Sequence, residues 1–109
     1  MTSLVRGRVY AAVLSGLDDL GRKPYLVVSN NRRNAALVSV LAVRLTTSPK
    51  PALPSIIESG PGDPVAGRVL CDDLVELWPD EVRADLGALT PETMRRVNAG
   101  LRAALALDA

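Results

Sequence analysis

Histidine and phenylalanine are absent from this 109-residue chain, and cysteine occurs once, as Cys71. Without histidine the chain has no Ser-His pair, no Cys-His pair and no zinc site that uses imidazole. A single cysteine cannot form an internal disulfide, which favours a reduced, cytoplasmic setting. The most familiar signatures of hydrolases and metal centres are therefore excluded, and any chemistry must come from other side chains.

Long hydrophobic runs are also missing. No apolar stretch approaches the roughly 20 residues needed to span a bilayer, and the stretch from Val9 to Leu17 is followed directly by Asp18 and Asp19 instead of a cleavage pattern. We therefore expect neither a membrane segment nor a secretory leader.

Aromatic residues make up only 3% of the chain, although 48% of its residues are hydrophobic. A chain of this length is predicted to form one domain, residues 1–109, with a modest core of Leu, Val, Ile and Ala. Because such a core is thin, burial of further apolar surface in a homodimer is an expectation of the sequence.

The charge is unevenly distributed along the chain. Residues 1–54 hold eight cations and two acids, a net charge of +6, and the remaining five cations and ten acids carry −5. An electrically divided domain is typical of proteins with an anionic ligand, nucleic acid above all. The alternative is that the two halves neutralise each other across the fold.

Short β-branched runs separated by turn residues predict a mainly β protein. The expected strands cover residues 5–13, 24–30, 35–47, 55–59 and 65–78, the last interrupted by Asp72 and Asp73. The segment 30–34 is expected to form a turn, and the segment 82–89 is ambiguous. In the third strand Arg44 and Thr46 share one face and Val43 and Leu45 the other.

A helix is predicted at the C-terminus. Thr90 is a good N-cap, Pro91 fits the first helical position, and Glu92 favours the positive end of the helix dipole. An apolar stripe follows at Met94, Val97, Leu101 and Leu105. Strands followed by one amphipathic helix predict a small, partly closed β-barrel with the helix packed on it.

Polar residues gather at the predicted strand ends, and this set suits a phosphodiester. Cations stabilise charge on non-bridging oxygens, and hydroxyls and amides add directed hydrogen bonds. Solvated strand ends are the alternative. A metal site at Asp18 and Asp19 or at Asp72 and Asp73 is not expected, since adjacent carboxylates point apart on a strand or lie in solvated turns. The polar set comprises Arg22, Lys23, Ser29, Asn30, Arg44, Thr46 and Thr47.

Five blocks of the sequence resemble, in order and spacing, the MazF/PemK family of toxin-antitoxin ribonucleases: RGRVY, KPYLVVSNNRRN, LAVRLTTS, VLCDDLVEL and LGALTPETMRRVNAGLRAALAL. The resemblance covers essentially the whole chain. It implies an SH3-like barrel with a C-terminal helix, assembled as a homodimer. It also implies a toxin of a type II system that cuts single-stranded RNA at short motifs, needs no metal or other cofactor, and is inhibited by a cognate antitoxin.

The resemblance further implies two catalytic residues. In the family the residue before the proline of the second strand is usually arginine, and it acts with the first threonine that closes the third strand. Those positions are Lys23 and Thr46 here, with Arg22, Ser29, Asn30, Arg44 and Thr47 as candidate substrate-binding residues. The chain departs from the family at Lys23, at Arg8 where an acid is common, and between Ser15 and Leu20, where a Glu-Gln pair is missing.

Lysine is chemically acceptable in this role. When the 2′-hydroxyl attacks the adjacent phosphorus, the site must accept one proton, return another and stabilise charge at the phosphate. Lysine can titrate where arginine hardly does, although it lacks the planar fork that grips two oxygens. The alternative is a non-catalytic barrel, either a degenerate toxin or a gyrase inhibitor. The only tryptophan, Trp78, precedes the predicted helix, which counts against a gyrase inhibitor with a Trp-bearing tail.

Overall fold

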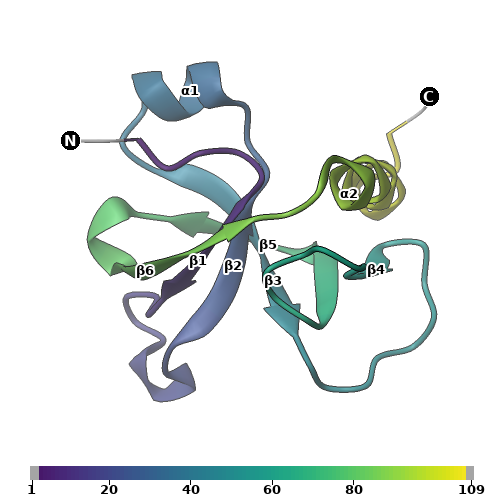
Figure 1. Cartoon of the computed structure of the whole chain (residues 1–109). Coiled ribbons are helices and arrows are strands. Elements are labelled where there is room, and N and C mark those ends of the chain that lie inside the picture. The colour runs from purple at the N-terminus through teal and green to yellow at the C-terminus, as the bar shows by residue number, and fades with distance from the viewer. Residues whose placement is uncertain (1–2, 108–109) are drawn as a thin grey trace.

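The computed structural model describes residues 3–107 and contains one antiparallel sheet of six strands (Figure 1). Its spatial order is β4-β5-β3-β2-β1-β6. The predicted mainly β fold with a C-terminal helix is confirmed. The elements are β1 (Arg8–Ala12), β2 (Lys23–Val27), α1 (Asn31–Ala36), β3 (Val40–Thr46), β4 (Ile56–Glu58), β5 (Arg68–Leu77), β6 (Val82–Ala88) and α2 (Pro91–Leu105), with 3₁₀ turns at Asp18–Leu20 and Pro79–Glu81.

The sheet buries hydrophobic side chains on both faces because successive residues of a strand point to opposite sides. One face carries what we call the first core, which contains Tyr10, Tyr25, Val27, Ala42 and Leu77 among others. The opposite face carries the second core. Its members are Val9, Leu26, Val43, Leu45, Val69, Cys71, Leu89 and Val97.

The second core lies between the sheet and α2, which packs against β4 and β5 (Figure 1). Gly100 allows this close approach: a Cβ at this position would lie 2.8 Å from the Cys71 sulfur. Burial, with a smaller contribution from Asp72, raises the pKa of the Cys71 thiol to about 11. Cys71 is therefore a small core residue that stays protonated at neutral pH.

Helix α2 begins as the sequence predicts, with the Thr90 hydroxyl accepting a hydrogen bond from the Thr93 N–H. A feature that the sequence does not reveal is Asp63, whose carboxylate accepts from the N–H of Thr90 and of Gly60 at 2.7 Å and from the Thr93 hydroxyl at 2.6 Å. The predicted apolar stripe is wrong at its end. Leu105 is 51% exposed, and Ala104 packs on the second core in its place.

Helix α1 corrects two predictions. The segment 30–34 was expected to be a turn and the third strand to begin at residue 35, yet residues Asn31–Ala36 form a helix and β3 begins at Val40. Asn30 is its N-cap, and its side-chain oxygen accepts from the Arg33 N–H at 2.8 Å. An asparagine favours a cap as readily as a turn, so composition alone did not separate the two.

The remaining boundaries differ in smaller ways. The first two predicted strands are longer than β1 and β2, and the ambiguous segment 82–89 contains β6. Asp72 and Asp73 were expected to interrupt the fifth strand, but β5 runs through them. Its pairing with β3 shifts there instead, because Val43 faces Leu74 while Leu45 faces Val69. No helix within residues 3–107 is long and apolar enough to cross a membrane.

Candidate functional site

The start of β2 and the end of β3 lie at the same end of the antiparallel pair that these strands form. Their ladder runs from Val27 paired with Ala42 to Tyr25 paired with Arg44, and it stops there. Lys23 and Thr46 lie two residues further along each strand, so both side chains point to the face of the first core. They lie just beyond the last paired residues of β2 and β3, and we call this end of the ladder the opening.

Proline explains part of why this ladder ends. Pro24 has no N–H to donate to β3, while the pairing of β2 with β1 on its other side continues as far as Lys23, which lies opposite Ala12. Lys23 is half-buried, whereas Arg22, one residue earlier, is exposed and precedes the strand. The two adjacent cations therefore occupy different environments, and Lys23 is the one held by the sheet.

Thr46 is held by its neighbours in an orientation that suits donation. Its hydroxyl oxygen accepts a hydrogen bond from the Ser48 N–H at 3.1 Å, and the hydroxyl donates no hydrogen bond to any residue in 3–107. Gly67, which directly precedes β5, approaches Thr46 closely: it has φ +138, and a Cβ there would lie 2.7 Å from the Thr46 carbonyl oxygen. A glycine is therefore required beside Thr46.

Arg44 lies between the first core and the opening. Its Nε is 3.2 Å from a carboxylate oxygen of Asp73, so the charges are paired. The geometry is not that of a directed hydrogen bond, and the buried Nε–H has no hydrogen-bond partner among the described residues. Burial raises the pKa of the Tyr25 hydroxyl, opposed by Arg44 and aided by Asp73 and Glu81, so Tyr25 stays protonated at neutral pH.

The structure does not bring all the predicted residues together. Thr47 is exposed and directly follows Thr46. Ser29 and Asn30 lie beyond the opposite end of β2, where each has a structural role. The Ser29 hydroxyl donates to Asn34 at 2.5 Å and accepts from the Leu41 N–H at 2.9 Å, and Asn30 caps α1.

Sequence reasoning missed three residues near the opening. Gly67 and Arg68 contact the end of β3, where Arg68 is the cross-strand partner of Thr46. Asp73 was expected to interrupt the fifth strand but lies on β5 and forms an ion pair with Arg44. A glycine at the start of an apolar run is a sign of close backbone approach, and it was the only signal available for this group.

The charge division of the sequence is partly neutralised by the fold. Two of the three ion pairs among residues 3–107, Arg8 with Asp85 and Arg44 with Asp73, join the basic first half to the acidic second half. The Asp85 side chain accepts from Arg8, which raises the arginine pKa and lowers the carboxyl pKa. Within the same residues no three His, Cys, Asp or Glu side chains are arranged to hold a metal ion.

Comparison of the sequence with known families gives one clear result. The profile of the PemK-like, MazF-like toxins of type II toxin-antitoxin systems matches residues 5–105. Two curated relatives, endoribonuclease MazF1 of Mycobacterium bovis and endoribonuclease MazF4 of Mycobacterium tuberculosis, are each 42% identical over 107 residues. Each alignment covers 98% of this chain and 97% of the relative.

Solved structures agree with the sequence comparison. A mycobacterial endoribonuclease in complex with its cognate antitoxin superposes with a TM-score of 0.89 at 41% identity, covering 98% of this chain and 99% of the other. A MazE-MazF structure from Deinococcus radiodurans superposes with a TM-score of 0.80 at 22% identity, covering 99% and 100% of the two chains. The second likeness concerns the fold alone.

Proposed function

Because this chain belongs to the PemK/MazF-like family of type II toxins and is an endoribonuclease, we propose that it cuts single-stranded RNA at the opening between β2 and β3. Lys23 and Thr46 are the catalytic residues of this proposal, and Arg22, Arg44 and Thr47 surround the RNA backbone. The observation that carries it is the position of Lys23 and Thr46 on one face, where the ladder of β2 and β3 ends.

The proposed reaction is an internal transesterification. The 2′-oxygen bonds to the adjacent phosphorus and the bond from phosphorus to the 5′-oxygen breaks, which leaves a 2′,3′-cyclic phosphate and a 5′-hydroxyl. One proton leaves the 2′-hydroxyl and one reaches the leaving oxygen. Lys23 supplies positive charge and takes part in proton transfer, while the Thr46 hydroxyl donates to a non-bridging oxygen as charge develops there.

Ser29 and Asn30 enter this proposal in a lesser role. Both were expected to bind substrate, but their side chains already make hydrogen bonds that shape the junction of β2 and α1. An RNA that contacted both this junction and Lys23 would have to span the length of β2. We therefore assign the phosphodiester to the Lys23 end and leave to the Ser29 end a contact with a distant part of the RNA.

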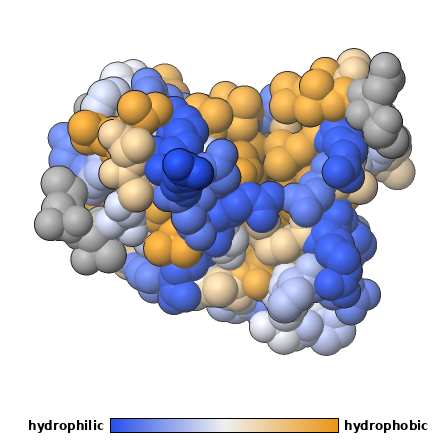
Figure 2. Space-filling model, turned by 90° about the horizontal axis from the view of Figure 1, so that it is seen from above, coloured by the Kyte–Doolittle hydropathy of each residue, from blue (hydrophilic) through white to orange (hydrophobic). Residues whose placement is uncertain are grey.

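A homodimer and an antitoxin partner are part of the same proposal. A mycobacterial relative is described in complex with its cognate antitoxin. Figure 2 shows hydrophobic surface in the hollow between the α1 side and the α2 side of the molecule. Exposed leucines elsewhere on the chain are further apolar surface that a second copy could bury: Leu74 of β5 is 40% exposed and Leu105 of α2 is 51% exposed. An RNase of this kind would act in the cytoplasm.

The catalytic proposal is favoured over a non-catalytic barrel of the same fold. The curated relatives at 42% identity carry the name endoribonuclease. The gyrase-inhibitor alternative needs a tryptophan in the C-terminal tail, and here Trp78 follows β5 instead.

Chemically defined RNA tests the proposed reaction. An oligonucleotide with a 2′-deoxy sugar at the cleaved position should resist cutting, while all-ribose RNA should yield a cyclic phosphate and a 5′-hydroxyl in the presence of EDTA. Sequencing of the fragment ends from total RNA would identify the recognised motif. Equal cutting of the deoxy substrate, or a 5′-phosphate product, would overturn the mechanism.

A further inference from the structure

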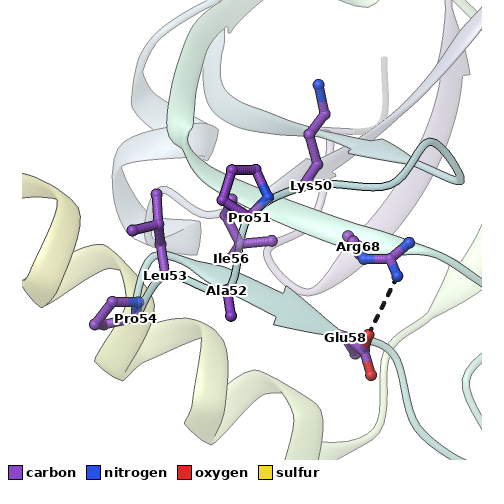
Figure 3. Close-up of a pocket in the computed structure, with 8 residues that line it drawn as sticks. All are labelled: Lys50, Pro51, Ala52, Leu53, Pro54, Ile56, Glu58 and Arg68. Atoms are coloured by element: carbon purple, nitrogen blue, oxygen red, sulfur yellow. Dashed lines mark ion pairs between the residues drawn. The ribbon is translucent and has the colours of Figure 1, made fainter.

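A pocket of about 410 Å³ lies beside the end of β3, between the proline-rich segment 47–55 and the strands β4 and β5 (Figure 3). Its apolar lining includes Pro51, Leu53 and Ile56. Proline fixes its own backbone torsion, so this segment loses little freedom when it binds a ligand. The pocket is a preformed apolar surface that the chemistry described above does not use.

Two cations and one acid lie around this apolar surface. In Figure 3 Lys50 and Arg68 lie on the same side of Pro51 and Ile56. Arg68 is directed at Glu58, whereas the Lys50 side chain extends away from it. The contacts of Arg68 are long: its Nη2 is 3.4 Å from the Glu58 carboxylate, and its Nη1 is 3.4 Å from the Ser48 carbonyl oxygen. Both lie at the far limit for a hydrogen bond. Lys50 has no ion pair or hydrogen bond within residues 3–107.

The pocket is joined to the proposed catalytic site by strand register. Thr46 pairs with Arg68 across β3 and β5, and Arg68 pairs with Glu58 across β5 and β4. Directly opposed residues share a face and lie about 5 Å apart. Arg68 therefore lies directly opposite Thr46, on the face that also carries Lys23 and Arg44. The chain that leaves Thr46 reaches Lys50 within four residues.

From this arrangement we propose that the pocket binds the nucleotide adjacent to the cleaved phosphodiester. Its base lies against Pro51 and Ile56, and Lys50 and Arg68 contact its phosphate. This inference rests on the proposed function, because it names a subsite of the same RNA. Splayed bases of single strands are commonly bound between apolar or guanidinium surfaces with the backbone on cations, and a phosphate offers Arg68 a closer partner than Glu58 does.

Binding measurements test the subsite without requiring cleavage. RNA with a 2′-deoxy sugar at the cleaved position is titrated against the wild type, Lys50→Ala, Arg68→Ala and the control Arg95→Ala, whose side chain is exposed on α2. Each cation that contacts a phosphate of a single strand contributes about 0.7 to the slope of log K against log salt. Lys50→Ala and Arg68→Ala should each lower the slope by about that amount and weaken binding by roughly tenfold.

Truncated RNA gives the sharper result. One RNA is shortened on the 5′ side of the cleaved bond and another on the 3′ side. Loss of the nucleotide that occupies the pocket should weaken binding to the wild type but not to the Lys50→Ala/Arg68→Ala double variant, since that variant has already lost the contact. Truncation on the other side should affect both proteins equally. If the double variant is as sensitive as the wild type to truncation on both sides, the pocket does not bind this nucleotide.

Two further variants separate binding from folding and from catalysis. Glu58→Gln removes the competing carboxylate, so RNA binding should tighten, whereas unchanged or weaker binding would overturn the role of Arg68. In cleavage assays the Lys50 and Arg68 variants should raise KM and leave kcat unchanged. If the wild type cuts RNA and the Lys50 and Arg68 variants bind and cut it equally well, the subsite alone is refuted. A wild type that never cuts RNA would refute the proposed function, and the binding measurements would still test the subsite.

Discussion

On the face of the second core, which we call the closed face, α2 covers the sheet and the polar groups at the start of α2 are paired. On the face of the first core, which we call the open face, polar groups without a full set of partners lie near the end of the ladder of β2 and β3. Asp63 accepts three hydrogen bonds at the start of α2. By contrast the Arg44 Nε–H has no hydrogen-bond partner in the part of the chain described here, and the Thr46 hydroxyl accepts one bond but donates none there. The polar groups at the start of α2 are thus paired with one another, whereas among the described residues the Thr46 hydroxyl keeps its donor unused.

The largest effect is expected from Lys23. Lys23→Ala should reduce kcat/KM for RNA by about 10²- to 10⁴-fold, because the proposed mechanism assigns to Lys23 both a positive charge and a part in proton transfer. Lys23→Arg restores the residue usual in relatives and should recover activity if charge is what the position supplies. Circular dichroism and thermal unfolding of both variants should match the wild type, and full activity of Lys23→Ala would remove Lys23 from the mechanism.

Gly67 lies against the backbone of Thr46, whose side chain is on the open face. Gly67→Ala places a Cβ within 2.7 Å of the Thr46 carbonyl oxygen at a φ of +138, so Thr46 must move. A misplaced catalytic group costs up to about a hundredfold in rate, and we expect kcat to fall accordingly. Gly62→Ala is the matched control: it also has a left-handed φ, of +87, and its nearest contact is Thr90 at 3.4 Å. It should lower stability and leave kcat unchanged.

Gly100 tests the closed face. A Cβ there would meet the Cys71 sulfur at 2.8 Å and Ile57 at 3.1 Å, and overpacking of this kind costs about 1–3 kcal/mol. The better helix propensity of alanine offsets about 1 kcal/mol of it. Gly100→Ala should therefore lower the free energy of unfolding in urea without changing kcat. Cys71→Ala in the same chain should relieve the contact, and additive effects of the two changes would contradict this packing account.

Asp63 gives an effect similar in size to that of Gly100 and links the stability of the closed face to pH. Burial alone would raise its pKa, but hydrogen bonds from Thr90, Thr93 and Gly60 outweigh burial and lower it. A lowered native pKa means that this stabilisation is present above the unfolded value of about 3.9 and is lost as pH falls through the native value. Asp63→Asn should destabilise the protein by roughly 1–2 kcal/mol at pH 7 and by less at acidic pH, as unfolding in urea would show. A constant difference between pH 7 and pH 3 would contradict this role.

The two faces also differ in how far the sequence predicted them. The start of α2 at Thr90, and the shared face of Arg44 and Thr46, followed from caps and from the two-residue period of a strand. The position of Lys23 and Thr46 as a pair came from a family resemblance, because strand order cannot be read from one sequence. Contacts such as Arg44 with Asp73 or Gly67 with Thr46 depend on where the pairing of β3 and β5 shifts, and no local pattern encodes that shift.

Helix α1 shows the same limit at shorter range. Asn30 could begin a turn or cap a helix, and what stabilises the helix is in part tertiary: the Arg6 N–H donates to Asn31 at 2.7 Å. Arg33 in turn donates to the Ser39 carbonyl oxygen at 2.9 Å. Two adjacent cations thus lie near each end of β2, Arg22 and Lys23 at its start and Arg32 and Arg33 after its end, but Arg33 is bound within the fold.

The most direct test of the open face is the hydroxyl of Thr46. Thr46→Val keeps the shape of the side chain and removes the donor, and Thr46→Ser keeps the donor and removes a methyl group. Single-turnover cleavage of one defined RNA should be slowed about 10²- to 10³-fold in Thr46→Val and far less in Thr46→Ser, with melting temperatures close to that of the wild type. Cleavage by Thr46→Val at the wild-type rate would contradict the assignment of the catalytic site to this face.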